Sequence, residues 1–263
     1  MTVISLLSAT GVHEKALRRF FKGDVFHNGS KIFDHPLYCI GFHNRSGSNL
    51  LADYLRNTPY FSGFHEQLNF NTVENQSSEW GVKNFPDFIR EATIRFGGGQ
   101  FVHGFKASVD QLMMLQRFNI PKMFKGGMRI IHITRRDLVG QAISFQIASQ
   151  TQRWTSQQVG LGDDVKVAFD ESKITNVIDA AQKSANGISM FSEVFGCPRL
   201  HVSYEELVQS PSQTLARVAR FAGQEAAEWP IGDPKISRQS SELNTHFREM
   251  YIDRLREMLE CPH

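Results

Sequence analysis

The 263-residue sequence has few cysteines and no long hydrophobic run. Its three cysteines, Cys39, Cys197 and Cys261, follow no disulfide or metal-site spacing, which is typical of a protein from a reducing compartment. No stretch approaches the roughly 18 apolar residues that a membrane span requires. The first ten residues contain no basic leader and no small-residue cleavage site. We therefore expect a cytoplasmic protein without a transmembrane segment.

A large excess of charge is also missing. Lysine and arginine (29) nearly balance aspartate and glutamate (27), and the net charge of +2 provides no general attraction to nucleic acid or to an acidic membrane. The ten histidines are scattered singly, a pattern that argues against a metal site. Any site for an anion must therefore be local, and we expect no nucleic-acid partner and no metal.

The length fits one domain spanning residues 1–263, close to the soft limit of about 250–300 residues for a single core. Short β-rich runs alternate with longer segments of helical period, which predicts an α/β fold with a parallel sheet flanked by helices. Strands are expected at 37–42, 61–65, 101–105, 129–134 and 199–203. Helices are expected at 48–57, 85–96, 109–118, 138–153, 174–195 and 213–222, with an amphipathic helix ending the segment 232–263.

Two stretches, 67–83 and 155–172, lack clear periodicity. Long irregular loops in a compact domain are often functional. We therefore assign both stretches to acceptor binding or to a lid.

The segment 37–51 is an apolar run followed by a small polar loop and then by a helical pattern. A loop that leads directly into a helix directs unpaired backbone N–H groups and the positive end of the helix dipole at a bound anion. Glycine permits close approach of the backbone, while hydroxyl, amide and guanidinium groups add donors. The loop residues of these types are Arg45, Ser46, Gly47, Ser48 and Asn49.

This loop is not a Walker A motif, which requires two glycines separated by four residues and followed by lysine. Gly41 and Gly47 are one residue too far apart, and Ser48 follows where the lysine is needed. The sequence thus favours an anion held without Mg²⁺ and argues against a nucleotide-dependent kinase, which is the first alternative function.

A second anion-binding pattern follows the expected strand 129–134. Asp137 is a suitable N-cap for the next helix, and Ser144 lies two turns further on the same helix face. Arg136 and Ser144 can converge on one small anion at the carboxyl end of the strand. In the alternative reading, the arginines form ion pairs and Ser144 only packs.

Together these patterns resemble the sulfotransferases that use 3′-phosphoadenosine-5′-phosphosulfate (PAPS), and within them the trehalose sulfotransferase-like bacterial group. The loop 45–49 is similar to the Lys/Arg-Ser/Thr-Gly-Ser/Thr-Thr pattern of that superfamily, and Arg136 and Ser144 reproduce its arginine and serine eight residues apart. The segments 135–145, 202–208 and 238–244 are similar to the trehalose-type group.

The resemblance implies a P-loop NTPase-like fold with helices on both faces of the sheet, and it implies PAPS as cofactor, released as adenosine 3′,5′-bisphosphate (PAP) without a metal. Asn49 stands where relatives usually have threonine, so an amide N–H would replace a hydroxyl contact. The implied cofactor residues are Arg45, Ser46, Gly47, Ser48 and Asn49 at the 5′ end, Arg136 and Ser144 at the 3′-phosphate, Tyr204 near the adenine, and Arg238 and Gln239 closing over the cofactor.

The resemblance also implies a catalytic base in the segment 62–68. Glu66 matches the glutamate that takes the acceptor's proton, with Arg45 as the catalytic charge of the loop. His65 is the competing base, and a base elsewhere also stays open. Lys106 either touches the transferring group or is an exposed strand-end lysine, and Trp80 and Trp154 either stack on a sugar or belong to the core.

The expected function is therefore transfer of a sulfuryl group to a hydroxyl of a carbohydrate or glycolipid. A non-enzymatic protein that keeps the fold for binding is the second alternative. The expected partners are a small-molecule or glycolipid acceptor and, as a homo-oligomer, further copies of the chain.

Overall fold

A computed structural model describes residues 2–97, 102–154, 166–224 and 242–260 of the chain. Its centre is one five-stranded parallel sheet with the strand order β2-β3-β1-β4-β5. The strands are β1 (Leu37–Gly41), β2 (Phe61–His65), β3 (Val102–Ala107), β4 (Met128–Thr134) and β5 (Arg199–Ser203). All five predicted strands are confirmed, and β3 extends two residues beyond its predicted end, so that Lys106 lies within it.

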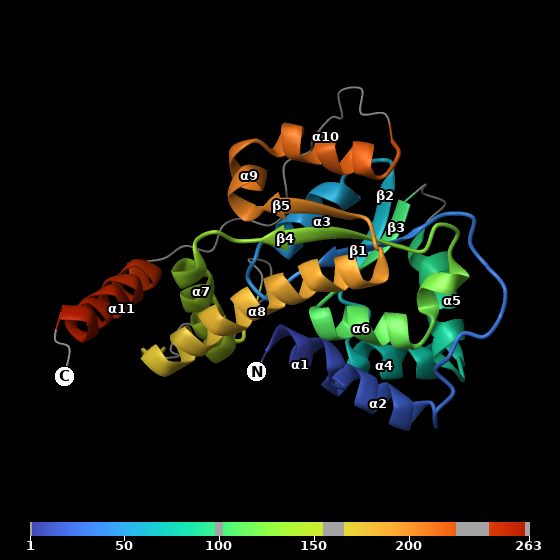
Figure 1. The fold of residues 1–263 in the computed structure, drawn as a ribbon, viewed down its shortest axis with the longest axis horizontal. Coiled ribbons are helices and arrows are strands. Elements are labelled where there is room, and N and C mark those ends of the chain that lie inside the picture. Colours follow the sequence, from blue (N-terminus) through green and yellow to red (C-terminus); the bar gives the residue numbers. More distant parts are fainter. Residues whose placement is uncertain (1, 98–101, 155–165, 225–241, 261–263) are drawn as a thin grey trace.

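Helices cover both faces of this sheet, as expected for the fold class (Figure 1). One face buries apolar side chains of three helices: α3 (Ser48–Arg56), α9 (Tyr204–Gln209) and α10 (Pro211–Phe221). The opposite face is covered by a larger set: α2 (Val12–Phe20), α4 (Phe70–Trp80), α5 (Phe85–Gly97), α6 (Val109–Arg117) and α8 (Glu171–Phe195), with α1 (Val3–Ser8) and the 3₁₀ helix η1 (Ile120–Met123) beside them. The three central strands, β1, β3 and β4, are buried over most of their length, so ligands reach this part of the sheet from the strand ends.

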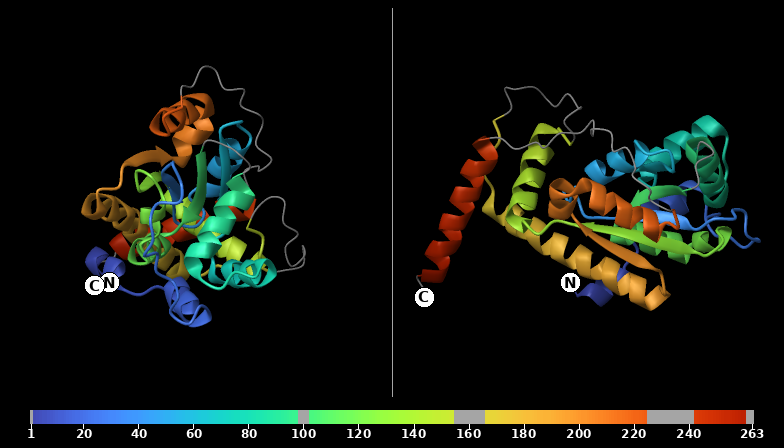
Figure 2. Two further views of the ribbon diagram at one scale, coloured as in Figure 1. Left: turned by 90° about the vertical axis from the view of Figure 1, so that its right-hand side faces the viewer. Right: turned by 90° about the horizontal axis from the view of Figure 1, so that it is seen from above.

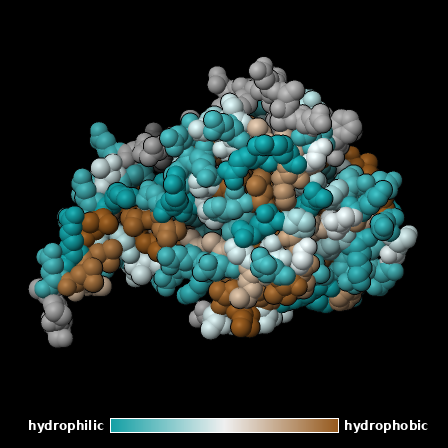
Figure 3. All heavy atoms as spheres, turned by 45° about the horizontal axis from the view of Figure 1, so that its top comes forward, coloured by the Kyte–Doolittle hydropathy of each residue, from teal (hydrophilic) through white to brown (hydrophobic). Residues whose placement is uncertain are grey.

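A smaller cluster lies at one end of the molecule. Helix α7 (Leu138–Thr151) packs against the first half of α8 and against α11 (Glu242–Glu260), which lies beside α7 in Figure 2. Phe247 and Tyr251 of α11 are buried in this cluster, and Figure 3 shows hydrophobic side chains along the helix. The predicted C-terminal amphipathic helix is confirmed, and Met258 near its end is exposed.

The prediction of an irregular loop at 67–83 is wrong, because helix α4 occupies most of this stretch, while its role in acceptor binding or as a lid stays a prediction. This helix buries only Val73 and Ser77 completely, so its sequence carries little hydrophobic periodicity, and it is held against α2 by tertiary contacts. In the second stretch, residues 155–165 lie outside the described residues, and α8 begins at Glu171 with Asp170 as its N-cap. Among the described residues, no helix is both long and apolar enough to cross a membrane.

Candidate active site

The carboxyl ends of the five parallel strands meet at one edge of the sheet, and the predicted site residues follow these ends. In spatial order across the edge lie Glu66 after β2, Lys106 in β3, the loop after β1, Arg136 after β4, and Tyr204 after β5. The chain leaves β1 and β4 toward opposite sides of the sheet, which is where open α/β sheets bind ligands. The sequence therefore places a loop for anions between a carboxylate end and an arginine end.

The loop after β1 is closely packed. Gly47 is the N-cap residue of α3 and has a φ of 92°, and a Cβ atom there would lie 2.5 Å from Cδ2 of Tyr204. Only glycine combines this conformation with this contact. The hydroxyl of Ser46 is 1% exposed, lines a cleft and has no hydrogen-bond partner among the described residues. A buried donor without a partner at the start of a helix fits an anion.

Arg45 ties this loop to α7. Its Nε donates to Oγ of Ser144 at 2.9 Å, and a second guanidinium nitrogen donates to the carbonyl oxygen of Trp154. Burial and the nearby Arg135 lower the pKa of Arg45, but a guanidinium remains a cation at any physiological pH. Ser144 is thus held by Arg45, and it forms no hydrogen bond with Arg136 in the part of the chain that the structure describes.

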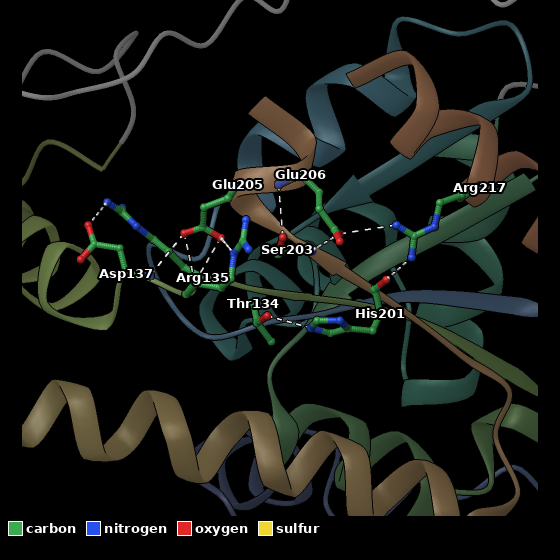
Figure 4. A network of polar contacts seen from close by, with 9 residues as sticks. Thr134, Arg135, Asp137, His201, Ser203, Glu205, Glu206 and Arg217 are labelled. Carbon is green, nitrogen blue, oxygen red and sulfur yellow. Dashed lines mark hydrogen bonds and ion pairs between the residues drawn. The ribbon is translucent and has the colours of Figure 1, made fainter. Parts of the chain in front are cut away.

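Arg136 lies instead in a turn held by Glu205. The Glu205 carboxylate accepts the backbone N–H groups of Arg136 and Asp137 and lies 3.5 Å from Nε of Arg136 (Figure 4). The Arg136 side chain is 68% exposed. Asp137 accepts the backbone N–H of Gly140 at 3.0 Å, which confirms it as the N-cap of α7. The arginine therefore forms an ion pair, as one of the two readings of this motif expected.

Arg135 is the residue at this end that sequence reasoning missed. Its guanidinium carbon lies 5.0 Å from the ring centre of Tyr204, and its Nη2 lies 3.4 Å from Asp137. Its Nε is buried and has no hydrogen-bond partner among the described residues. The eight-residue spacing to Ser144 selected Arg136, while the adjacent arginine carried no spacing signal of its own.

Arg135 and Arg136 line a cleft of about 510 Å³ that lies between the loop after β1, the end of β4 and helix α8. His43 and His132 also line it, and burial lowers the pKa of both, that of His132 to about 3, with His201 and Arg199 as further causes for His132. Both imidazoles are therefore neutral at pH 7. None of the described residues that line this cleft is a carboxylate, so the cleft favours an anionic ligand.

The opposite end of the edge is organised around Lys106, whose side chain is only 2% exposed. Its Nζ lies 2.6 Å from Oε1 of Glu66, also donates to Oδ1 of Asn49, and lies 4.5 Å from the ring centre of Phe42. Lys106 is therefore not an exposed strand-end lysine. It joins the anion loop to the candidate base.

Glu66 and His65 compete for the role of base, and their environments differ. Burial alone would raise the pKa of Glu66, but the charge and hydrogen bond of Lys106 and a hydrogen bond from Asn69 bring it below its ordinary value. Burial, Arg56 and Lys106 lower the pKa of His65. At pH 7 the first side chain is thus an anion and the second is neutral, and both are solvent-accessible.

The remaining candidates divide by position. Trp154 contacts the ring of Phe145 at 5.5 Å and belongs to the α7 end through its carbonyl contact with Arg45. Trp80 stacks on Phe88 with ring centres 5.7 Å apart and thus serves packing. Arg238 and Gln239 lie outside the described residues. The described residues contain no group of three or more histidine, cysteine or carboxylate side chains that could hold a metal ion.

The sheet order and the anion loop after β1 define a P-loop-like group-transfer protein. The family model described as Stf0 sulphotransferase matches residues 37–257, so the chain belongs to the Stf0 sulphotransferase family. The resemblance to the PAPS-dependent sulfotransferase superfamily is thereby confirmed, and the chain is a sulfotransferase.

One solved structure supports the fold, and two others are similar to this chain at lower TM-scores. A sulfotransferase domain from the curacin biosynthetic pathway aligns with a TM-score of 0.50 and 14% identity over 76% of this chain and 77% of that one. A mouse sulfotransferase, SULT7A1, complexed with PAP aligns with a TM-score of 0.48 and 10% identity over 90% of this chain and 69% of that one. A sulfotransferase from Alicyclobacillus acidocaldarius aligns with a TM-score of 0.46 and 14% identity over 87% of this chain and 97% of that one. No curated protein matches the sequence.

Proposed function

We propose that this sulfotransferase moves a sulfuryl group from PAPS to a hydroxyl of a carbohydrate or glycolipid, with Glu66 as the general base. The observation that carries the proposal is the contact of buried Lys106 with both Asn49 of the loop and Glu66. This contact sets a carboxylate beside the site where the loop would hold the transferring group. Family membership supports the sulfuryl chemistry.

The residues present fit a cofactor with two anionic ends. Ser46, Gly47 and the N-terminus of α3 suit the 5′ end, because a buried hydroxyl without a partner among the described residues and the positive end of a helix favour an anion there. Arg135 and Arg136 suit the 3′-phosphate, and the ring of Tyr204 lies between the two groups. When bound, PAPS supplies the sulfuryl group, and PAP is the product that departs.

The chemistry assigned to this chain is proton removal and charge stabilisation. A sugar hydroxyl is a poor nucleophile at neutral pH, and a positioned carboxylate typically accelerates such a reaction by about 10²–10⁴-fold. Glu66 is ionised at pH 7 and 45% exposed, so it is ready to accept a proton and accessible to an acceptor. Lys106 supplies a fixed positive charge between base and loop, where negative charge grows during transfer.

The choice of acceptor rests on the resemblance to the trehalose-type group. Searching extracts incubated with enzyme and PAPS by mass spectrometry, for metabolites that gain one SO₃, identifies the acceptor. A carbohydrate or glycolipid product supports the proposal, and a product of another class contradicts this part of it.

A thermal-shift comparison tests the cofactor. Because a ligand of the native state raises the melting temperature, PAP is expected to stabilise the protein without added metal, while ATP with Mg²⁺ is not. Stabilisation by ATP with Mg²⁺ alone supports a kinase, and no response to either nucleotide supports a non-enzymatic binding protein.

The base is tested with two neighbouring substitutions and the identified acceptor. Glu66→Gln is expected to lower turnover by about 10²–10⁴-fold, whereas His65→Gln changes it only a few-fold. The reverse pattern assigns the base to His65. Normal turnover in both variants removes the base from this segment.

A further inference from the structure

The second oxygen of the Glu66 carboxylate is held by a chain of amides that begins at a backbone group. Nδ2 of Asn69 donates to Oε2 of Glu66 at 3.3 Å, and Nε2 of Gln111 donates to Oδ1 of Asn69 at 3.1 Å. Oε1 of Gln111 accepts the backbone N–H of Ser108 at 3.0 Å. The chain thus connects the start of α6 to the start of α4 and then to the carboxylate.

The direction of this chain follows from its first member. A backbone N–H can only donate, so the carbonyl oxygen of the Gln111 amide must face Ser108 and its NH₂ must face Asn69. The Asn69 amide must then accept with its oxygen, which leaves its NH₂ for Glu66. A free amide can turn either end toward a carboxylate, but this one cannot.

We propose that Asn69 and Gln111 are positioning residues of this enzyme, which hold the Glu66 carboxylate, together with Lys106, in the orientation that receives the acceptor's proton. This inference rests on the proposed role of Glu66. Lys106 binds Oε1 and Asn69 binds Oε2, so both oxygens have a fixed donor and the side chain has one favoured rotamer. Such support matters because a misplaced catalytic group loses much of its effect.

Neither amide is explained by stability of its helix alone. Asn69 is the N-cap residue of α4, yet its side chain makes no cap hydrogen bond. Gln111 is 3% exposed, and its carbonyl oxygen already completes the capping box of α6, so its NH₂ is left for Asn69. Buried amide chains of this kind restrict the geometry of the group at their end.

Asn69→Ala and Gln111→Glu test the proposal by different routes. Asn69→Ala removes the donor to Glu66 without removing a cap bond. Gln111→Glu keeps an acceptor for the Ser108 N–H but has no NH₂ for Asn69 when it is ionised. Asn71→Ala, at an exposed position of α4, is the matched control.

The first readout is a ¹³C NMR titration of the Glu66 carboxyl carbon, assigned by its loss in Glu66→Gln. Both variants are expected to raise the pKa of Glu66 by roughly half to one unit, since a hydrogen bond to the ionised form is lost or a like charge is added. Lys106 from β3, Arg56 from α3 and the adjacent His65 also act on this site and stay in place in all variants. Asn71→Ala leaves the titration unchanged.

The second readout is sulfuryl transfer as a function of pH. We expect Asn69→Ala to lower turnover about tenfold and to move the acidic limb of its pH profile to higher pH. The affinity for PAP should stay within about twofold of wild type. A Glu66 titration unchanged in both folded variants overturns the positioning role whether or not the protein transfers sulfuryl groups. Normal turnover in Glu66→Gln, with the titration shifted as expected, overturns the base assignment instead.

Discussion

The two ends of the sheet's carboxyl edge are built differently. At the β2–β3 end, a buried lysine and one carboxylate pair at 2.6 Å, and amides hold the remaining carboxylate oxygen. At the β4–β5 end, Arg135 and Arg136 are paired with Asp137 and Glu205 at 3.4–3.5 Å, beside a cleft of about 510 Å³. The first end is tightly hydrogen-bonded and nearly neutral in charge, whereas the second is open and rich in cations.

This difference indicates a division of work along one edge. A fixed, charge-balanced pair suits proton transfer, which requires accurate geometry. Weakly paired arginines around an open cleft suit an anion that enters and leaves, because long and exposed ion pairs contribute little and are easily exchanged. The anion loop after β1 lies between the two ends and, in the proposed function, serves both.

The largest expected effect comes from the β2–β3 end. Lys106→Met removes a buried cation and is expected to lower turnover by about 10²–10³-fold, as for loss of one preorganised donor. Because the Lys106 charge lowers the pKa of Glu66, the acidic limb of the pH profile should also move to higher pH. Steady-state kinetics across pH measure both effects, with exposed Lys122→Met as control. Wild-type turnover in Lys106→Met would show that this end does not depend on the buried cation.

At the open end, the protonation of His132 should make the stability of the folded protein decrease at acid pH. Its pKa is lowered to about 3 in the native state, against about 6.5 when unfolded, so the unfolded chain binds the extra proton between these values. The stabilisation is complete above pH 6.5 and declines as pH falls, and His132 should account for about 2 kcal/mol of the stability lost between pH 7 and pH 5. Urea denaturation should show a smaller loss in His132→Gln, while exposed His246→Gln behaves like wild type. An equal loss in His132→Gln contradicts this assignment.

The arginines of the open end should govern cofactor affinity. Since Arg136 is 68% exposed, its replacement by alanine is expected to weaken PAP only about tenfold, or about 1.4 kcal/mol, and less so at high salt. Arg135→Ala should weaken PAP binding by the same amount, because Arg135 also lines the cleft. Calorimetric titration measures both, with Arg90→Ala as a surface control. Unchanged affinity in both variants would remove the 3′-phosphate from this end.

The smallest expected effect is a gain in affinity for PAP. Glu205→Gln removes the charge that competes for Arg136 but keeps an acceptor for the two backbone N–H groups of the turn. PAP affinity should rise about two- to fivefold at low salt and return toward wild type at high salt. A loss of affinity would show that Glu205 acts through the turn rather than through its charge.

The sequence was sufficient for the sheet and for the edge at which the candidate site residues lie. The strands are apolar runs bounded by turns, and their carboxyl ends necessarily share one edge, so Glu66, Lys106 and Arg136 could be assigned to that edge in advance. The anion loop was recognisable because Gly47 stands where a strand leads directly into a helix.

Side-chain directions were not predictable in the same way. The contact of Arg45 with Ser144 joins residues 99 positions apart. Lys106 of β3 is covered by Phe42 and Asn49, which follow strand β1. Helix α4, with Asn69 at its start, escaped detection because its buried side is too short to produce a period. Arg135 was passed over because spacing alone cannot choose between adjacent arginines.

The most direct test of the division between the two ends is the affinity of Glu66→Gln for PAP, measured by isothermal titration calorimetry against wild type. Because Glu66 belongs to the proton-transfer end and carries no cofactor contact in this account, the dissociation constant should stay within about threefold of wild type, even where turnover has collapsed. A loss of PAP affinity as large as that of Arg136→Ala would show instead that Glu66 and the arginines belong to one binding site.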